Sequence, residues 1–134
     1  MKTWTWIVAA LLLVPGLGNA QTQHCEGSQR ELNECAAAVA EAADEELNAV
    51  YRAVIRSLRG ETLAIQRLRE AQRLWIQLRD ADIEALYPVP DGEDYRVHQG
   101  SIYPLRFWSA QAEVTRARTA WLRTHFLEHE EGQL

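Results

Sequence analysis

The sequence predicts a small all-α protein, an antiparallel three-helix bundle with one disulfide. Two observations support this fold class: apolar residues recur every three or four positions in three long segments, and turn residues separate those segments. The chain has 134 residues, 47% of them apolar and 25% charged, which fits one globular domain. We expect a long helical hairpin with a third helix packed on it.

Residues 1–20 have the features of a secretory signal peptide. Lys2 is followed by an apolar run from Trp4 to Val14, and small residues then lead to Ala20. The run is shorter than the roughly 20 residues that a membrane-spanning helix needs. We therefore expect cleavage before Gln21, a periplasmic or secreted protein, and no membrane anchor after signal cleavage.

The charge of the mature chain limits the class of partner. Lys2 is the only lysine, so the net charge changes from −5 for the whole sequence to −6 for residues 21–134. Nucleic acids and anionic lipids bind clustered cations. We expect neither as the main partner, whereas a basic protein would suit this charge.

The two cysteines predict a disulfide between Cys25 and Cys35. Export places both in an oxidising compartment, where paired thiols normally form a bridge. Closing this loop contributes roughly 3 kcal/mol in the chain-entropy model. Two alternatives are weaker: the residues before Cys25 lack the small and aliphatic pattern of a lipidation site, and the spacing does not resemble a zinc site.

The first helix is predicted to begin at a capping box formed by Ser28 and Glu31. Gly60 supplies the stop signal at the other end. The apolar or small positions between them are Leu32, Cys35, Ala36, Val39, Ala43, Leu47, Val50, Val54 and Leu58.

The second helix is predicted to end at Tyr87, before Pro88. Only residues 60–62 separate it from the first, which makes the two antiparallel neighbours. Its expected buried stripe is Leu68, Ala71, Trp75, Leu78, Ala81 and Ala85, with Ile65, Ile76 and Ile83 nearby.

Residues 88–100 are rich in turn residues and have no period, so they are predicted to form a long loop. The third helix is expected to begin with Ser101 as its cap and Pro104 in its first turn. Its stripe is Ile102, Leu105, Trp108, Ala112, Thr115, Thr119, Leu122 and Phe126. We expect the helical domain to cover residues 21–127 and a flexible tail to cover 128–134.

Several short strings of residues carry a resemblance to a known family. They are Gln29-x-Glu31-Leu32-Asn33-x-Cys35-Ala36, Ala43-Asp44-x-Glu46-Leu47-Asn48-x-x-Tyr51, Ala71-Gln72-Arg73-x-Trp75-Ile76-x-x-Arg79-Asp80-Ala81, Gly100-Ser101-Ile102 and Thr115-Arg116-x-Arg118-Thr119. In this order they resemble the N-terminal domain of the lysozyme inhibitor LprI-like family. The resemblance implies a small exported all-helical protein, in a family where lysozyme inhibition is established for few members.

The chain departs from the family at one pair of positions. The family commonly has two further cysteines, and this sequence has Ile83 and Ala110 in their places. Cys25 and Cys35 match the remaining family pair. The resemblance therefore implies that one disulfide and helix packing hold this chain together.

The resemblance also singles out six polar residues, which are Asp44, Asn48, Gln72, Arg79, Thr115 and Arg118. Helical spacing places those of the first two helices at the seams between helices. They could form a polar pocket whose arginine binds an anion, or a hydrogen-bonded network that fixes the helix register. An unpaired buried polar group costs about 1–3 kcal/mol, which favours the structural network.

The chemistry-bearing motifs do not predict an enzyme. His125, Glu128 and His129 match the H-x-x-E-H pattern of some zinc peptidases, but only the tail acids Glu130 and Glu131 could complete the site. We find no Ser-His-Asp arrangement, phosphate-binding loop or free cysteine nucleophile. We expect no catalytic residues, metal or cofactor.

The sequence therefore favours an exported helical binding protein that resembles a lysozyme inhibitor and occludes a basic protein partner. We place the candidate contact in the loop, at Asp91, Glu93, Asp94, Tyr95, Arg96 and His98. Two alternatives stay open. The loop could be a solvated connection, and the protein could be a periplasmic envelope-stress, assembly or toxin-immunity protein with no lysozyme role.

Overall fold

The computed structural model describes residues 24–128, which form four helices. These are α1 (Gln29–Ser57), α2 (Thr62–Leu86), α3 (Tyr95–His98) and α4 (Tyr103–Phe126). The expected signal peptide and residues 129–134 lie outside the described residues. Within them the all-α class is confirmed, with three long helices as predicted and the short α3 inside the expected loop.

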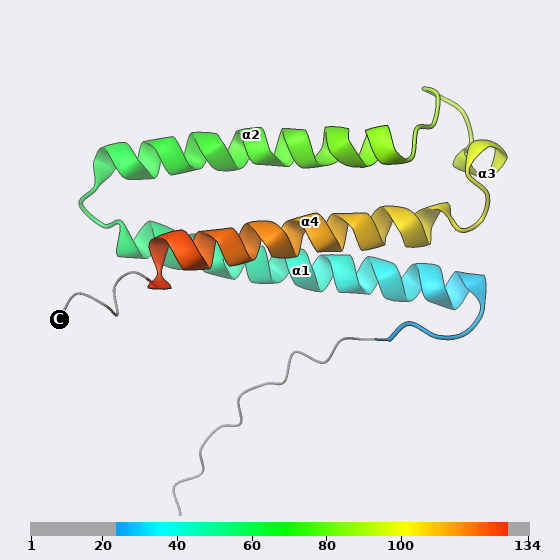
Figure 1. The fold of residues 1–134 in the computed structure, drawn as a ribbon, viewed down its shortest axis with the longest axis horizontal. Coiled ribbons are helices and arrows are strands. Elements are labelled where there is room, and N and C mark those ends of the chain that lie inside the picture. Colours follow the sequence, from blue (N-terminus) through cyan, green and yellow to red (C-terminus); the bar gives the residue numbers. More distant parts are fainter. Residues whose placement is uncertain (1–23, 129–134) are drawn as a thin grey trace, which may run out of the picture.

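The three long helices run in alternating directions along the chain (Figure 1). α2 returns antiparallel to α1, and α4 runs back in the same direction as α1. The closest backbone packing is between α1 and α4, whereas α2 lies farther from both. α1 and α2 are therefore antiparallel, as predicted, but they do not pack closely. Long side chains bridge the space between them.

The start of α1 confirms the predicted capping box. The Glu31 amide donates to Ser28 Oγ over 3.4 Å, and the Ser28 amide donates to Glu31 Oε2 over 2.7 Å. Gly27 precedes the cap with φ of +116°, and a Cβ there would lie 2.6 Å from Glu31 Oε2. Glycine is favoured at this position, because L side chains rarely adopt such a positive φ and a Cβ would shift the capping carboxylate.

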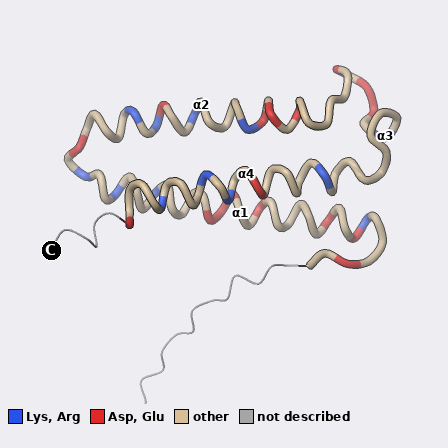
Figure 2. The backbone as a smooth tube through the Cα atoms, viewed as in Figure 1, with Lys and Arg blue, Asp and Glu red and all other residues tan. Residues whose placement is uncertain are grey.

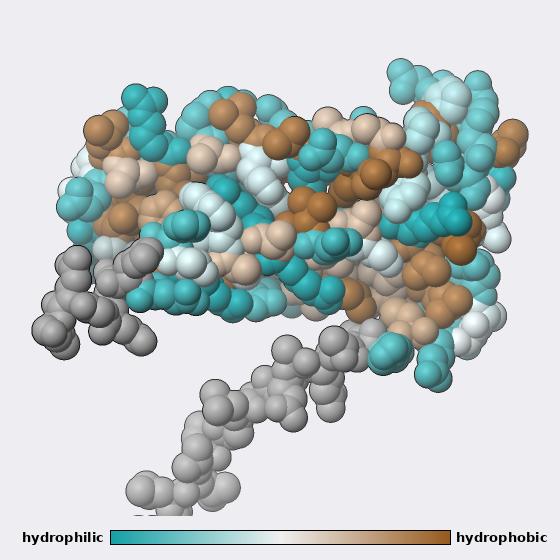
Figure 3. All heavy atoms as spheres, viewed as in Figure 1, coloured by the Kyte–Doolittle hydropathy of each residue, from teal (hydrophilic) through white to brown (hydrophobic). Residues whose placement is uncertain are grey.

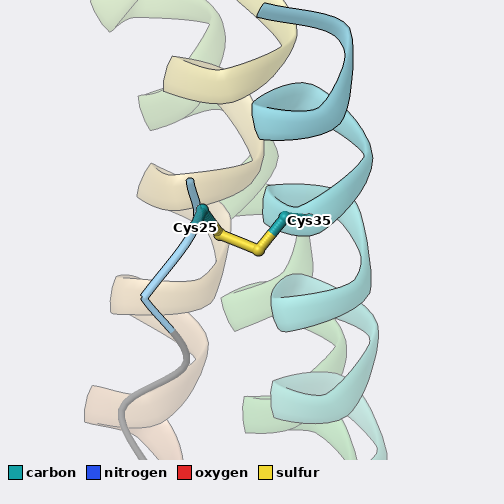
Figure 4. The surroundings of a disulfide bond; sticks show 2 residues. All are labelled: Cys25 and Cys35. Atoms are coloured by element: carbon teal, nitrogen blue, oxygen red, sulfur yellow. A yellow bond between two sulfur atoms is a disulfide. The ribbon is translucent and has the colours of Figure 1, made fainter. Parts of the chain in front are cut away.

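The predicted disulfide between Cys25 and Cys35 is confirmed, with a Cα–Cα distance of 5.7 Å. Cys25 lies in the segment before α1, and Cys35 lies in the second turn of the helix (Figure 4). The bond therefore fastens the N-terminal segment to the side of α1.

Small residues form the seam between α1 and α4. Ala40 and Ala43 of α1 pack with Ala112 of α4, and Val39 and Trp108 flank this cluster. Small side chains allow two helices to approach closely. A second cluster lies beyond the seam and includes α2; its buried members are Leu47, Val50, Val54, Leu68 and Leu122.

The face that α2 turns inward differs from the predicted stripe. Leu68 and Ile83 are its buried residues, and half-buried Gln72, Trp75 and Arg79 lie on the same face. Four residues of the predicted stripe are exposed, namely Ala71, Leu78, Ala81 and Ala85. The stripe was wrong at these positions because long polar side chains, rather than small apolar ones, bridge the space to α1 and α4.

The start of α4 also differs from the prediction. Ile102 is the N-cap residue and makes no side-chain cap, whereas Ser101 lies in the preceding turn. The backbone oxygen of Ser101 instead accepts a hydrogen bond of 3.0 Å from Asn33 Nδ2 of α1. Pro104 lies in the first turn, where its missing amide leaves no bond unmade.

Candidate functional site

Asp44 of α1 lies where the three long helices meet. Its Oδ1 accepts a hydrogen bond of 3.2 Å from Arg79 Nη1 of α2, and its Oδ2 accepts one of 3.2 Å from Gln111 Nε2 of α4. Thr115 Oγ1 of α4 donates to Oδ1 over 3.4 Å. The side chain of Arg79 is only 12% exposed, against 37% for Asp44. One carboxylate thus links all three helices.

Arginine and tryptophan side chains alternate beside this carboxylate. The Arg79 guanidinium lies 5.3 Å from the centre of the Trp75 ring, and Arg118 lies 5.8 Å from the same ring. Arg118 also lies 4.7 Å from the ring of Trp121. Such cation–π contacts hold both guanidinium groups against aromatic faces. We call these four residues the Arg–Trp ladder.

The guanidinium group of Arg118 is only partly satisfied by hydrogen bonds. Its Nε donates a hydrogen bond of 3.1 Å to Gln72 Oε1, while its Nη2 is buried and has no partner within residues 24–128. Burial lowers the pKa of Arg118 below the usual arginine value. The ladder therefore holds a partly desolvated cation between α2 and α4.

The structure brings together most of the six polar residues that the resemblance singles out. Asp44 contacts Arg79 and Thr115, and Gln72 contacts Arg118. Asn48 instead is exposed and lines a groove on the surface. The sequence reasoning missed Gln111, which could have been found because it precedes Thr115 by one helical turn.

A surface groove of about 610 Å³ lies beside Asp44. Four acidic residues of α1 line it together with Trp108 and Gln111 of α4; the acids are Glu34, Glu41, Asp44 and Glu45. We call it the acidic groove. Figure 2 shows red segments along α1. No arginine or lysine of residues 24–128 lines the groove to neutralise these acids, so the groove can attract a cationic partner.

The segment between α2 and α4 is an ordered projection. Asp94 caps α3, since its Oδ1 accepts a hydrogen bond of 2.8 Å from the Arg96 amide. His98 pairs with Glu93, and Gln99 Nε2 donates to the backbone oxygen of Pro88 over 3.0 Å. Several of the candidate loop residues are thus paired with one another.

An aromatic cluster fastens this projection to the bundle. The Tyr95 ring stacks on Tyr103 with centres 4.9 Å apart, and Tyr87 meets Tyr103 edge-on at 6.5 Å. Tyr103 in turn lies 5.7 Å from Phe107. Val97 points outward and is 79% exposed, which the sequence reasoning missed. An apolar residue within a strongly polar loop was the available signal.

The described residues offer no cluster of side chains suited to metal binding. No three His, Cys, Asp or Glu side chains in residues 24–128 gather where a metal could bind. Of the H-x-x-E-H pattern, His125 packs its ring 4.7 Å from Trp121, and His129 lies outside the described residues. No helix of the described part is both long and apolar enough to cross a membrane.

Comparisons with known proteins bear on most of this chain. A family model described as "Lysozyme inhibitor LprI" matches residues 20–122. An uncharacterized protein of Rhizobium meliloti (strain 1021) is 34% identical over 107 residues, covering 72% of this chain and 72% of the relative. No solved structure matches the chain. The matched range includes the Asp44 contacts, the acidic groove and the whole α3 projection.

Proposed function

Because the chain belongs to the lysozyme inhibitor LprI family, we propose that it is an exported binding protein that inhibits a lysozyme. It acts by occluding the cleft of the enzyme, without chemistry of its own. The observation that carries this proposal is the ordered α3 projection at one end of the bundle (Figure 1). A projection that is already folded loses little conformational freedom when it enters a cleft.

The tip of the projection suits such a contact. Arg96 and Val97 are consecutive exposed residues of α3. The Arg96 guanidinium lies 5.1 Å from the centre of the Tyr95 ring and 3.4 Å from the Asp94 carboxylate. Val97 would bury its apolar surface, while Arg96 would approach the carboxylates that line a polysaccharide-cleaving site. Tyr95 also stacks on Tyr103, and this contact supports the position of the projection.

The acidic side chains supply the second part of the proposal. Asp91, Glu93 and Asp94 lie on the same projection, and the acidic groove lies along α1. With a net charge of −6 for residues 21–134, these groups would steer a basic lysozyme toward the protein. The groups that accelerate encounter and those that fill the cleft are therefore different residues.

A turbidity assay of lysozyme on cell walls tests this function. Purified, disulfide-bonded protein at micromolar concentration should slow the loss of turbidity, and Val97→Asp combined with Arg96→Ala should abolish that inhibition. A matched control, Glu41→Gln with Glu45→Gln, alters the groove and leaves the projection intact, so it should slow association and still inhibit at high concentration.

Two results would contradict the proposal. Full inhibition by the Arg96 and Val97 double variant would move the contact to another surface, such as the acidic groove. No inhibition by the unaltered protein, with its helical circular dichroism intact, would remove the lysozyme role. The envelope-stress, assembly and toxin-immunity functions would then be the remaining candidates.

A further inference from the structure

α2 carries a second apolar stripe that the bundle leaves uncovered. Ala71, Leu74, Leu78, Ala81 and Ala85 follow one another at alternating spacings of three and four residues, and all are exposed. Leu74 is 51% exposed and Leu78 is 59% exposed. Figure 3 shows apolar surface at intervals along α2, at the top of the view. We call these five residues the outer stripe.

The outer stripe has the spacing of a helix-pairing seam. Alternation of three and four residues is the a/d pattern by which two helices interlock side chains. Single exposed leucines are common on protein surfaces, but a repeated pattern over four turns is not explained that way. The inward face of α2 is separate, because it is built from Leu68, Gln72, Trp75, Arg79 and Ile83.

The charges of α2 indicate what would cover the outer stripe. Residues 62–74 contain three arginines and one glutamate, a net charge of +2, whereas residues 75–86 contain one arginine and three acids, a net charge of −2. Figure 2 shows acidic segments gathered toward the end of α2 that leads to α3. An antiparallel copy of α2 would place each basic half beside an acidic half.

We propose that two copies of this protein pair through the outer stripes of their α2 helices, in antiparallel orientation. Leu74 lies opposite Leu78 of the partner subunit, which places two pairs of leucines at the centre of the interface. Ala71 lies opposite Ala81 of the partner subunit, and these small residues allow the helices to approach closely. Arg67 lies near the acidic end of the partner's helix.

The surface beside the outer stripe extends this interface. An apolar hollow of about 270 Å³ lies next to Ala71, between α2 and α4, and its walls include Trp121 and Phe126. Trp121 is among the exposed large hydrophobic residues of the described chain. Pairing along α2 would thus cover part of this hollow in addition to the outer stripe. The two α3 projections would lie at opposite ends of the pair, free to bind.

Sedimentation equilibrium on the intact, disulfide-bonded protein tests the pairing. At up to about 100 µM the protein should have twice the mass of one chain, and Leu74→Glu with Leu78→Glu should reduce it to the mass of one. The matched control is Ile76→Glu with Leu86→Glu, which adds the same charges to exposed positions of α2 off the outer stripe. It should leave the dimer mass unchanged, and circular dichroism checks that each variant is folded.

Cross-linking tests the orientation. A mixture of Leu74→Cys and Leu78→Cys proteins should form a cross-linked dimer under mild oxidation, and each variant alone should form little. Self-cross-linking of each variant alone would indicate parallel pairing and overturn the antiparallel model.

Other results would overturn the dimer itself. A single-chain mass at every concentration would do so, as would a dimer that survives Leu74→Glu with Leu78→Glu. If the unaltered protein is monomeric and that variant no longer binds lysozyme, the outer stripe would be a contact surface for lysozyme and the dimer would be ruled out. Because mass is measured without lysozyme, failure of this inference is distinguishable from failure of the proposed function.

Discussion

At the scale of single residues, the Asp44 side chain connects the three long helices. It accepts hydrogen bonds from Arg79, Gln111 and Thr115, so it joins α1 to both other long helices. Hydrogen bonds with a charged partner are stronger than neutral ones. The acceptor role needs an ionised carboxylate with both oxygens available, which no neutral side chain supplies.

Asp44→Asn should therefore lower the free energy of unfolding by about 1–3 kcal/mol, because it removes the charge that faces Arg79 and one acceptor oxygen. Urea unfolding followed by circular dichroism measures the change. Asp80→Asn is the control, since Asp80 binds the same arginine from an exposed position, and it should cost no more than about 1 kcal/mol. Equal losses for the two variants would contradict this role of Asp44.

Glu31 makes the stability of α1 depend on pH. Hydrogen bonds from the side chain and then the backbone of Ser28 hold the pKa of Glu31 below its ordinary value of 4.5. A carboxyl whose pKa is lower in the folded state stabilises that state above its unfolded pKa, and this stabilisation is lost as pH falls through the folded pKa. Acid thus weakens the capping box.

The melting temperature of Glu31→Gln should consequently fall less steeply than that of the unaltered protein as pH drops below 4.5. Thermal unfolding followed at a series of acidic pH values measures both slopes. Glutamine can still accept from the Ser28 amide at this position, so the variant remains capped and isolates the charge. Identical slopes would show that the Glu31 carboxylate does not contribute to acid sensitivity.

At the scale of helices, the close packing of α1 and α4 depends on small side chains. Ala40 is 1% exposed and Ala112 is 1% exposed, so neither position has room for a larger residue. Ala40→Leu should destabilise the protein by about 1–3 kcal/mol, because the added side chain forces α1 and α4 apart. Ala42→Leu adds the same atoms at an exposed position of α1 and should leave the urea midpoint almost unchanged. A stable Ala40→Leu variant would contradict the close seam.

The helices also show what the sequence could and could not predict. Ser28, Glu31 and the apolar period located α1 correctly, since capping and periodicity are local properties of the chain. The apolar period alone misplaced the inward face of α2. The polar residues that the resemblance singled out mark that face instead, since Gln72 contacts Arg118 and Arg79 contacts Asp44. Two apolar stripes compete on this helix, and only tertiary contacts decide which one is buried.

The α3 projection was harder still to predict. Turn residues indicated a loop correctly, but the helix of four residues depends on Asp94 as its cap and on stacking between Tyr95 and Tyr103. Those two tyrosines lie in different parts of the fold, so their contact has no local signature. The pairing of Cys25 with Cys35, in contrast, followed from their number and the expected compartment alone.

At the scale of the whole molecule, the disulfide compensates for a small core. The bond closes a short loop at the start of α1, so its loss should destabilise the protein by roughly 3 kcal/mol in the chain-entropy model. Replacing both Cys25 and Cys35 by serine should lower the urea midpoint, while the helical circular dichroism at low urea persists. An unchanged midpoint would mean that the N-terminal segment contributes nothing to the stability of the bundle.

The net charge of the molecule predicts how inhibition responds to salt. Residues 21–134 have a net charge of −6, and acids line both the acidic groove and the α3 projection. Attraction between exposed charges is largely screened beyond about 10 Å at 0.1 M salt, so added salt should slow association with a basic lysozyme. Under the proposed function dissociation should change little, because it would be governed by the short-range contacts of Arg96 and Val97 with the cleft. Surface plasmon resonance at low and high salt separates the two rates, and Glu41→Gln with Glu45→Gln should reduce the salt dependence of association. A salt effect confined to dissociation would contradict steering of the encounter by the acidic side chains.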